Sequence, residues 1–420
     1  MTVWPPDTAP PWRAPDAGRL LSIAVVVGAA AAIALVVLIA LFLPMLNWDL
    51  LAYVGVVKSW SLTSPHAIQT AAYADVHQFA ETRGMTAAWQ ALTGTAIPYR
   101  HIVATDPIAF VRQLPFYRIR PLYLVLLWLV SLLTPTVSAA AVDVSAAAVL
   151  LSALLLAWFA RRSASTATAS VWSAMFCLTP LVVTVARLQT PDALAMLAVV
   201  AASLLFLSRR PVAATAIMLG AVLIRTDLMI LAVTLAAVLF AYDAWLGRRQ
   251  RFGVIVTLLG SMAIEIAVSR WSGNYGYLTL LKFTFVDRAA DPSVAAAARL
   301  SLAAFLGDLW NGIVRAVAIG KFPLVVVVAL GIPFLFDRRT MPRESLVLYV
   351  ALILYLIAHS VLFPALDGRF AAPVFGGLFA ILIAEAGRCR AAAAQNRWNP
   401  KIVPTSSPIV HPTSAASSNA

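Results

Sequence analysis

Residues 43–53 read LPMLNWDLLAY, and the interpretation of the whole chain depends on them. They lie where the first long apolar run ends and the first long polar loop begins. Trp48 and Tyr53 suit the depth of the lipid headgroups, which amphipathic aromatic rings prefer. Asp49 lies between them, so its carboxylate is expected at the water interface, where it can stay ionised and reach a lipid-borne group. A plainer alternative is that Asp49 caps the next helix, since Asn and Asp are favoured N-caps.

The composition is that of a polytopic, all-α membrane protein. The 420 residues are 61% hydrophobic and only 12% charged, with a mean hydropathy of +0.87, whereas a soluble domain carries about 25% charged residues. The net charge is +13, but the basic residues fall in pairs between apolar runs. That pattern is typical of the positive-inside rule, so no nucleic-acid partner is expected. The two cysteines, Cys177 and Cys389, indicate no disulfide framework.

The segment 121–137 decides the predicted topology, because it barely reaches the minimum length of a span. If it does not cross, every later Arg pair falls on the side of the N-terminus, which is then the cytoplasm. We therefore interpret 121–137 as re-entrant, in a protein of the inner (plasma) membrane with both termini cytoplasmic. The alternative lets 121–137 cross and leaves Arg13 and Arg19 on the wrong side. The ten predicted spans are 20–46, 138–160, 166–186, 193–207, 212–224, 228–246, 252–268, 323–336, 346–362 and 371–386.

The predicted organisation is one transmembrane domain between two disordered ends. Residues 1–19 are expected to form a cytoplasmic leader, residues 20–390 the domain, and residues 391–420 a Pro/Ser/Thr-rich tail. Within the domain, a first outer loop (47–120) is long enough for short interfacial helices. A later outer segment (270–322) contains residues 294–319, which are amphipathic enough to lie in the interface.

Charged residues collect at the predicted outer ends of the helices. Ionisable groups at membrane depth are costly and are functional hypotheses by default. Capping or headgroup anchoring explains any one of them equally well, but a set that shares one face favours function. The set is Asp49, Arg118, Arg120, Asp192, Arg225, Asp227 and Arg369.

Glycosyl transfer from a lipid-phosphate donor is a chemistry that such a set could support. Asp49 could deprotonate the acceptor hydroxyl as a general base. Arginine forks bind phosphate bidentately, and Asp192 could orient a sugar hydroxyl or hold a divalent cation such as Mg²⁺ or Mn²⁺. The His residues of the first loop have no zinc-ligand spacing, so no metal ligands are assigned. The predicted catalytic residues are Asp49 and Asp192; the predicted substrate-binding residues are Tyr53, Tyr117, Arg118, Arg120, Arg225, Asp227 and Arg369.

The chain resembles the GT-C membrane glycosyltransferases, which include protein O-mannosyltransferases, the aminoarabinose transferase of lipid A and the catalytic subunits of oligosaccharyltransferase. Four short motifs, spread over residues 20–386, carry the resemblance. They are Asn47-Trp48-Asp49 with Tyr53, Thr190-Pro191-Asp192, Arg225-Thr226-Asp227-Leu228, and Asp367-Gly368-Arg369-Phe370 followed by Pro373.

This resemblance implies a polyprenyl-phosphate-linked sugar as donor and transfer on the outer face to a glycan, lipid or protein of the envelope. It also implies that Asp49 is the base and that the first loop carries surface helices. The chain departs from the family in having a single acid in the first motif, where a pair is common. Metal dependence is therefore left open.

Two other classes of function compete with the transferase. A transporter or flippase for a lipid-linked sugar would use the same arginines for phosphate, but it needs polar groups along a path through the bilayer. Here only Glu265 is predicted to lie deep, within 252–268. The other alternative is a non-catalytic subunit of an envelope assembly, in which Asp49 would have no chemical role.

Overall fold

The computed structural model describes residues 17–245, 251–286, 291–318, 321–336, 341–364 and 367–398. These residues form helices joined by short connections and contain no β-strand, which confirms the predicted all-α class. Most of the predicted leader and tail lies outside the described residues. Of the leader, residues 17–19 already belong to the first helix, and of the tail, residues 391–398 continue the last one.

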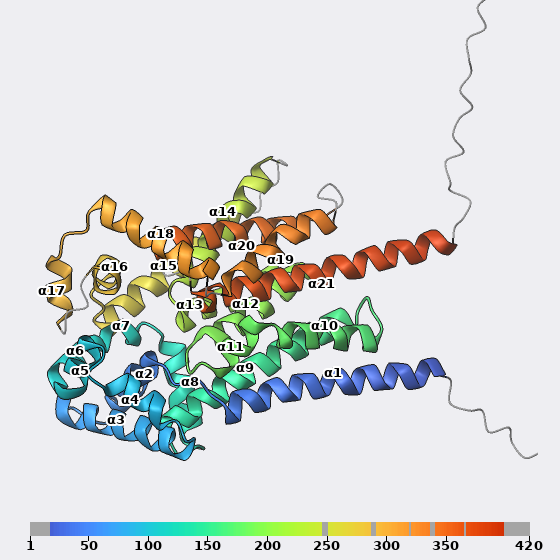
Figure 1. Cartoon of the computed structure of the whole chain (residues 1–420). Coiled ribbons are helices and arrows are strands. Elements are labelled where there is room, and N and C mark those ends of the chain that lie inside the picture. Colours follow the sequence, from blue (N-terminus) through green and yellow to red (C-terminus); the bar gives the residue numbers. More distant parts are fainter. Residues whose placement is uncertain are drawn as a thin grey trace, which may run out of the picture.

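Most of the helices gather in one apolar bundle (Figure 1). Each of the ten predicted spans falls on helical structure. By length and composition, five of the described helices are long and apolar enough to cross a membrane singly. The number rises to eight if each sharply bent pair of helices is counted as one span. These apolar helices indicate a multi-pass membrane protein. The bundle consists of α1 (Ala17–Phe42), α9 (Val137–Ala160), α10 (Thr166–Leu178), α11 (Pro180–Arg187), α12 (Asp192–Leu207), α13 (Pro211–Ile224), α14 (Leu228–Trp245), α15 (Arg251–Ser272), α19 (Phe322–Leu335), α20 (Arg343–Leu362) and α21 (Gly368–Trp398).

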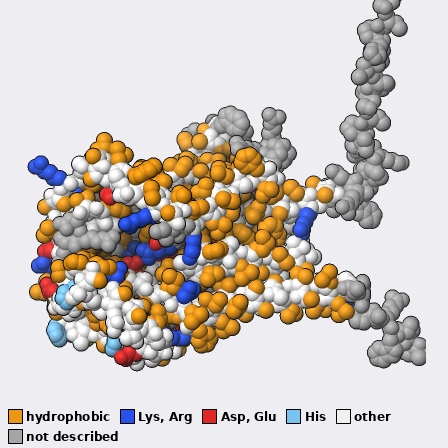
Figure 2. Space-filling model, viewed as in Figure 1, with side chains coloured by type: hydrophobic (Ala, Val, Ile, Leu, Met, Phe, Trp, Pro, Cys, Tyr) orange, Lys and Arg blue, Asp and Glu red, His pale blue; other side chains and the backbone are white. Residues whose placement is uncertain are grey.

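Shorter helices form a cap at one end of the bundle, opposite the end where α1 begins and α21 ends (Figure 1). Hydrophobic side chains cover the bundle, while acidic, basic and His side chains gather over the cap (Figure 2). The cap consists of α2 (Trp48–Lys58), α3 (Pro65–Thr82), α4 (Thr86–Thr93), α5 (Pro98–Thr105), α6 (Pro107–Gln113), α7 (Pro115–Arg118), α8 (Pro121–Ser131), α16 (Tyr277–Phe285), α17 (Pro292–Ala297) and α18 (Leu302–Ala318).

Two predicted elements are divided in the structure, and the first of them breaks at a proline. The single span expected over 166–186 is broken into α10 and α11, with a bend of 64°, because Pro180 has no N–H to continue the helix. The amphipathic stretch at 294–319 is likewise divided between α17, which starts at Pro292, and α18. The helix α8 has 11 residues, beginning with Pro121. A helix of that length is about 16 Å long, roughly half of the hydrocarbon thickness, so α8 alone does not cross.

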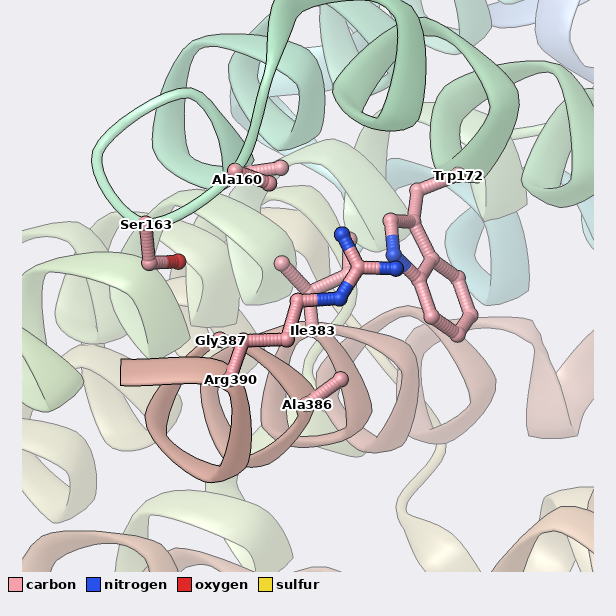
Figure 3. Close-up of a pocket in the computed structure, with 8 residues that line it drawn as sticks. Ala160, Ser163, Trp172, Ile383, Ala386, Gly387 and Arg390 are labelled. Carbon is pink, nitrogen blue, oxygen red and sulfur yellow. The ribbon is translucent and has the colours of Figure 1, made fainter. Parts of the chain in front are cut away.

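Paired glycines allow α21 to pack closely against α12 and α20. A Cβ on Gly376 would lie 2.7 Å from Val200 of α12, and a Cβ on Gly377 would lie 2.8 Å from Leu352 of α20. Near the other end of α21, a Cβ on Gly387 would overlap Ser163, beside a shallow hollow bordered by Trp172 and other side chains (Figure 3). Small residues serve this purpose in membrane bundles because they let helix backbones approach. The packing fixes where the first turn of α21 lies.

A buried carboxylate attaches the cap to the bundle. Asp75 of α3 accepts hydrogen bonds from the backbone N–H of Val137 (3.0 Å) and Ser138 (3.1 Å) and from the Ser138 hydroxyl (2.7 Å). Lys58, at the end of α2, pairs with the same carboxylate at 3.1 Å. The carboxylate satisfies the first N–H donors of α9, which have no partner within the helix, and the helix dipole also favours a negative charge there.

We expect Asp75→Ala to lower the free energy of unfolding by about 3 kcal/mol, because it leaves buried N–H donors and Lys58 without their acceptor. Thermal and denaturant unfolding in detergent measure this. Glu81→Ala, on the exposed side of the same helix, is the matched control and should stay within about 0.5 kcal/mol of the parent. Equal effects of the two substitutions would contradict the assignment.

Candidate functional site

The stretch 43–53 is held against the turn between α11 and α12. The backbone N–H of Met45 donates to the carbonyl of Arg187 (2.9 Å), and the Asn47 amide donates to Gln189 (3.1 Å). Asn47 also caps α2, since its side-chain oxygen accepts the N–H of Leu50. The N-cap is therefore Asn47, and Asp49 in the first turn has its carboxylate free for other contacts. This tether brings the start of α2 close to the start of α12.

Asp49 pairs with an arginine from the last helix. Its Oδ2 accepts from Nη1 of Arg369 at 2.8 Å, and its Oδ1 accepts from the Tyr117 hydroxyl at 3.3 Å. Both charged side chains are mostly buried, with 24% and 22% of their surface exposed. Burial by itself raises the pKa of Asp49, but the attraction of Arg369 outweighs it, and the pKa falls below 3.8. The carboxylate is thus ionised at neutral pH.

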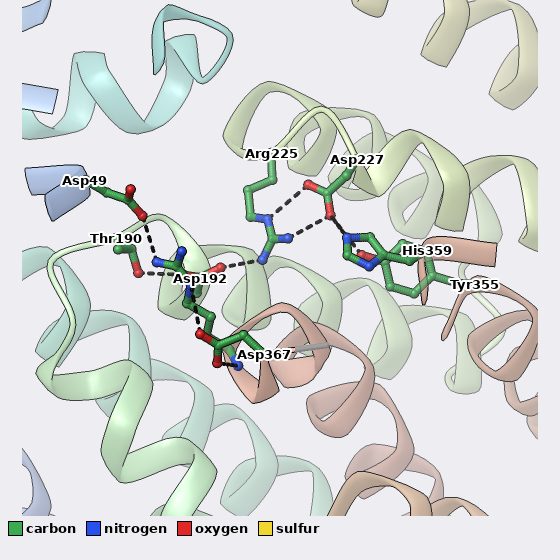
Figure 4. A network of polar contacts seen from close by, with 9 residues as sticks. Asp49, Thr190, Asp192, Arg225, Asp227, Tyr355, His359 and Asp367 are labelled. Carbon is green, nitrogen blue, oxygen red and sulfur yellow. Dashed lines mark hydrogen bonds and ion pairs between the residues drawn. The ribbon is translucent and has the colours of Figure 1, made fainter. Parts of the chain in front are cut away.

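Arg225 lies at the centre of a second, more deeply buried group of charges (Figure 4). Its side chain is only 4% exposed. The guanidinium binds Asp227 bidentately, with Nε to Oδ1 at 3.0 Å and Nη2 to Oδ2 at 2.7 Å, while Nη1 donates to Asp192. Asp192 also accepts the Thr190 hydroxyl at 2.6 Å. One guanidinium therefore joins the turn between α13 and α14 to the first residue of α12.

Two residues of α20 complete this group, and the sequence analysis did not single them out. The Tyr355 hydroxyl donates to Oδ2 of Asp227 at 3.0 Å, and Nε2 of His359 lies 3.2 Å from the same oxygen. Burial raises the pKa of Asp227, but Arg225 and His359 outweigh it and hold that pKa well below 3.8. A signal was present in the sequence: a lone histidine in the apolar run 346–362, one helical turn after a tyrosine.

Arg120 adds a third guanidinium on the cap side. It lies over the rings of Tyr53 (5.4 Å) and Tyr117 (5.7 Å) and donates to the carbonyl of Phe116. The Tyr53 ring is 1% exposed and packs edge-on against Tyr117 at 5.3 Å. Arg118 points elsewhere, to Ser59 at the far end of α2, about 15 Å from Asp49 by helical rise.

The structure thus brings together all but one of the nine predicted site residues; Arg118 is the exception. We refer to the six charged ones, Asp49, Asp192, Asp227, Arg120, Arg225 and Arg369, as the charge cluster. The charge cluster contains three carboxylates and three guanidinium groups. Within the described parts of the chain, no group of three or more His, Cys, Asp or Glu side chains is arranged to hold a metal ion.

Comparisons with protein-family models, with curated proteins and with solved structures find no match to this chain. Its function is therefore argued from the geometry and charge of the cluster. The arrangement offers an ionised carboxylate at the boundary between cap and bundle, guanidinium groups suited to an anionic oxygen, and tyrosine rings beside them.

We expect Asp227→Asn to lower the free energy of unfolding at neutral pH by about 3 kcal/mol, because Arg225 would lose its bidentate partner. The pKa of Asp227 is lowered in the folded state, so its contribution is fully present above pH 3.8 and is lost as the pH falls further. Thermal unfolding of the parent and the variant should therefore differ by a constant amount from pH 8 down to about 4 and converge below that. A difference that grows with acidity would contradict the pairing.

Proposed function

We propose that this protein is a GT-C type membrane glycosyltransferase. It would transfer a sugar from a polyprenyl-phosphate donor to a glycan, lipid or protein acceptor of the envelope, on the outer face of the plasma membrane. The observation that carries the proposal is the ion pair between Asp49 and Arg369 at the boundary between cap and bundle. It places a base and a phosphate-binding group in direct contact, with Arg120 close by.

The chemistry assigned to these groups balances without a further reactant. Asp49 takes the proton of an acceptor hydroxyl, and the hydroxyl oxygen forms a bond to the anomeric carbon of the donor. The bond between that carbon and the phosphate oxygen breaks, and its electron pair leaves with the polyprenyl phosphate. Arg369 and Arg120 stabilise the charge that develops on the leaving phosphate.

The ion pair also implies that the donor binds before Asp49 takes the proton of the acceptor hydroxyl. While Asp49 is held by Arg369, its pKa is low and it is a weak base. A donor phosphate binds arginine strongly and competes for the same N–H groups. Once Arg369 turns to the phosphate, Asp49 loses the strongest of the interactions that lower its pKa, and the pKa rises; Arg120 and Tyr117 continue to lower it. Donor binding therefore makes Asp49 a stronger base; without the donor, Asp49 stays paired with Arg369.

One observation favours the alternative of a lipid-linked sugar transporter. In α15, Oε2 of Glu265 is buried and has no hydrogen-bond partner within the described structure. An unpaired carboxylate at membrane depth is typical of ion or proton pathways. The charge cluster, in contrast, lies where α2, α12, α14 and α21 begin, and that favours the transferase. A role for Mg²⁺ or Mn²⁺ stays a prediction, since the three clustered carboxylates are already paired with arginines.

We expect Asp49→Asn to lower the rate of sugar transfer by about 10²-fold or more, because an amide cannot accept the proton. Transfer from a panel of polyprenyl-phosphate sugars to membrane acceptors measures this, with thermal unfolding as the check on folding. Asp106→Asn is the control: Asp106 is exposed and caps α6, and asparagine caps equally well. Parent-like turnover in Asp49→Asn would refute the base, and an absence of transfer by the parent from every donor would refute the transferase.

The proposed orientation has a test that uses a native residue. Cys389 is exposed at the end of the bundle away from the cap, and Cys177 is buried. We expect a membrane-impermeant maleimide to label a Ser61→Cys variant on intact cells, since Ser61 is exposed in the cap. Cys389 should react only after permeabilisation. The reverse pattern would place the cap in the cytoplasm and exclude transfer on the outer face.

A further inference from the structure

Two basic side chains lie on the cap side of the bundle, outside the charge cluster. Arg187 is the last residue of α11, and Lys321 immediately precedes α19. Thr184 and Arg187 are three residues apart and share the partly exposed face of α11. Lys321 donates a hydrogen bond to the Thr184 hydroxyl and lies within electrostatic reach of Arg187. We refer to Arg187 and Lys321 as the cation pair.

Most hydrogen-bond donors of the cation pair have no acceptor among the residues that the structure describes. Nε of Arg187 donates to the backbone carbonyl of Leu43 at 2.6 Å, and Lys321 donates to Thr184. A guanidinium carries five N–H donors and an ammonium group carries three, so one neutral acceptor for each cation leaves most donors unused. Both side chains are partly exposed, and their remaining donors are therefore within reach of an anion.

One carboxylate lies near the cation pair, but it is also engaged elsewhere. Asp367 pairs with Arg369 at 3.6 Å and attracts Lys321 electrostatically. Even if Asp367 is counted fully against the cation pair, one positive charge is left without a counter-charge. In the proposed orientation this is the outer side of the membrane, where the positive-inside rule disfavours surplus cations. A bound anion would account for the surplus.

Exposed apolar side chains border the cation pair on the side of α1. The backbone N–H of Met45 donates to the carbonyl of Arg187 at 2.9 Å, and the Arg187 side chain is bonded to Leu43. Phe42, Leu43 and Met45 are all exposed large hydrophobic residues. Figure 2 shows basic side chains where the hydrophobic surface of the bundle meets the cap. A ligand that carries both a negative charge and an apolar chain would match this surface.

The start of α19 adds to the attraction for an anion. No side chain caps this 14-residue helix, whose N-cap residue is Lys321. Its first N–H groups and its dipole therefore favour a negative charge at the same place as the ammonium group. A Cβ on Gly368 would lie only 3.3 Å from the backbone nitrogen of Lys321. This close approach holds the start of α19 against the first turn of α21.

We propose that the cation pair binds the headgroup of an anionic phospholipid. Arg187 and Lys321 share its phosphodiester group through charge-assisted hydrogen bonds, and an acyl chain lies along Phe42 and Leu43 at the end of α1. The single negative charge of such a headgroup balances the surplus positive charge. A zwitterionic phospholipid would be bound less tightly, because its own ammonium group is repelled by the cation pair.

The phosphate of the proposed sugar donor fits the cation pair less well. Asp367 pairs with Arg369 and also acts on Lys321, so its negative charge opposes the sharing of one phosphate between these two cations. The lipid site is therefore separate from the phosphate site assigned to Arg369 and Arg120. It does not depend on glycosyl transfer, and either proposal can fail while the other stands.

The test is native mass spectrometry of the full-length protein in detergent, titrated with dioleoylphosphatidylglycerol or dioleoylphosphatidylcholine. We expect the parent to bind the anionic lipid more tightly. Lys321→Gln and Arg187→Gln should each weaken the binding of phosphatidylglycerol about fivefold, which is the contribution of one cation near a membrane surface. Neither should change the binding of phosphatidylcholine. Arg270→Gln, which removes an exposed cation at the end of α15, is the matched control and should change neither affinity.

Competition on the parent keeps the proposal falsifiable if a glutamine variant does not fold, which thermal unfolding without lipid reveals. Bound phosphatidylglycerol should remain when an equimolar amount of polyprenyl phosphate or inorganic phosphate is added. Displacement by polyprenyl phosphate would assign the cation pair to the donor, and displacement by inorganic phosphate would assign it to a free anion; either result would overturn the proposal. Equal affinities of the parent for the two phospholipids would also overturn it, as would parental affinity for phosphatidylglycerol in both folded glutamine variants.

Discussion

The burial of Arg225 is the constraint on which the arrangement of helix ends beside the cap depends. An isolated guanidinium cannot be buried at a low cost, so its five donors require acceptors from whatever surrounds it. Two carboxylates supply them, Asp192 from α12 and Asp227 from the turn before α14, and α20 adds Tyr355 and His359 to the second. Three separate helix ends must therefore converge on one side chain, and any structure that separates them leaves a buried charge unpaired.

The close packing of α21 also helps to position the charge cluster. Gly376 and Gly377 let the backbone of α21 approach α12 and α20, and Arg369 lies two turns before them on the same helix. With α21 fixed in this way, the Arg369 side chain reaches Asp49 of the cap. Backbone contact in the apolar bundle thus sets the position of a charged group at its end, which an interaction between exposed side chains alone could not do.

The sequence was sufficient for the fold class, because 20-residue apolar runs separated by Arg pairs have few other interpretations. The sequence also predicted which residues form most of the charge cluster, since charged residues at the ends of apolar helices are rare enough to be informative. The sequence did not reveal which carboxylate pairs with which arginine. Asp49 could equally have capped α2, and only the hydrogen bond from the Leu50 N–H to the Asn47 side chain shows which residue has that role. His359 was overlooked although a lone histidine in an apolar run is itself a signal, because the residue belongs to none of the motifs considered. Arg118, next in sequence to residues that do converge, turns away because α7 ends there.

The ion pair between Asp49 and Arg369 joins residues 320 positions apart, and this has a consequence for biogenesis. Asp49 emerges with the first helix of the nascent chain, whereas its partner is synthesised only with the last. During that interval, the helices already inserted contain Asp49 without the positive charge of Arg369. Non-local contacts of this kind form late in folding. A chain that stops before α21 thus leaves Asp49 without its Arg369 partner until the last helix is inserted.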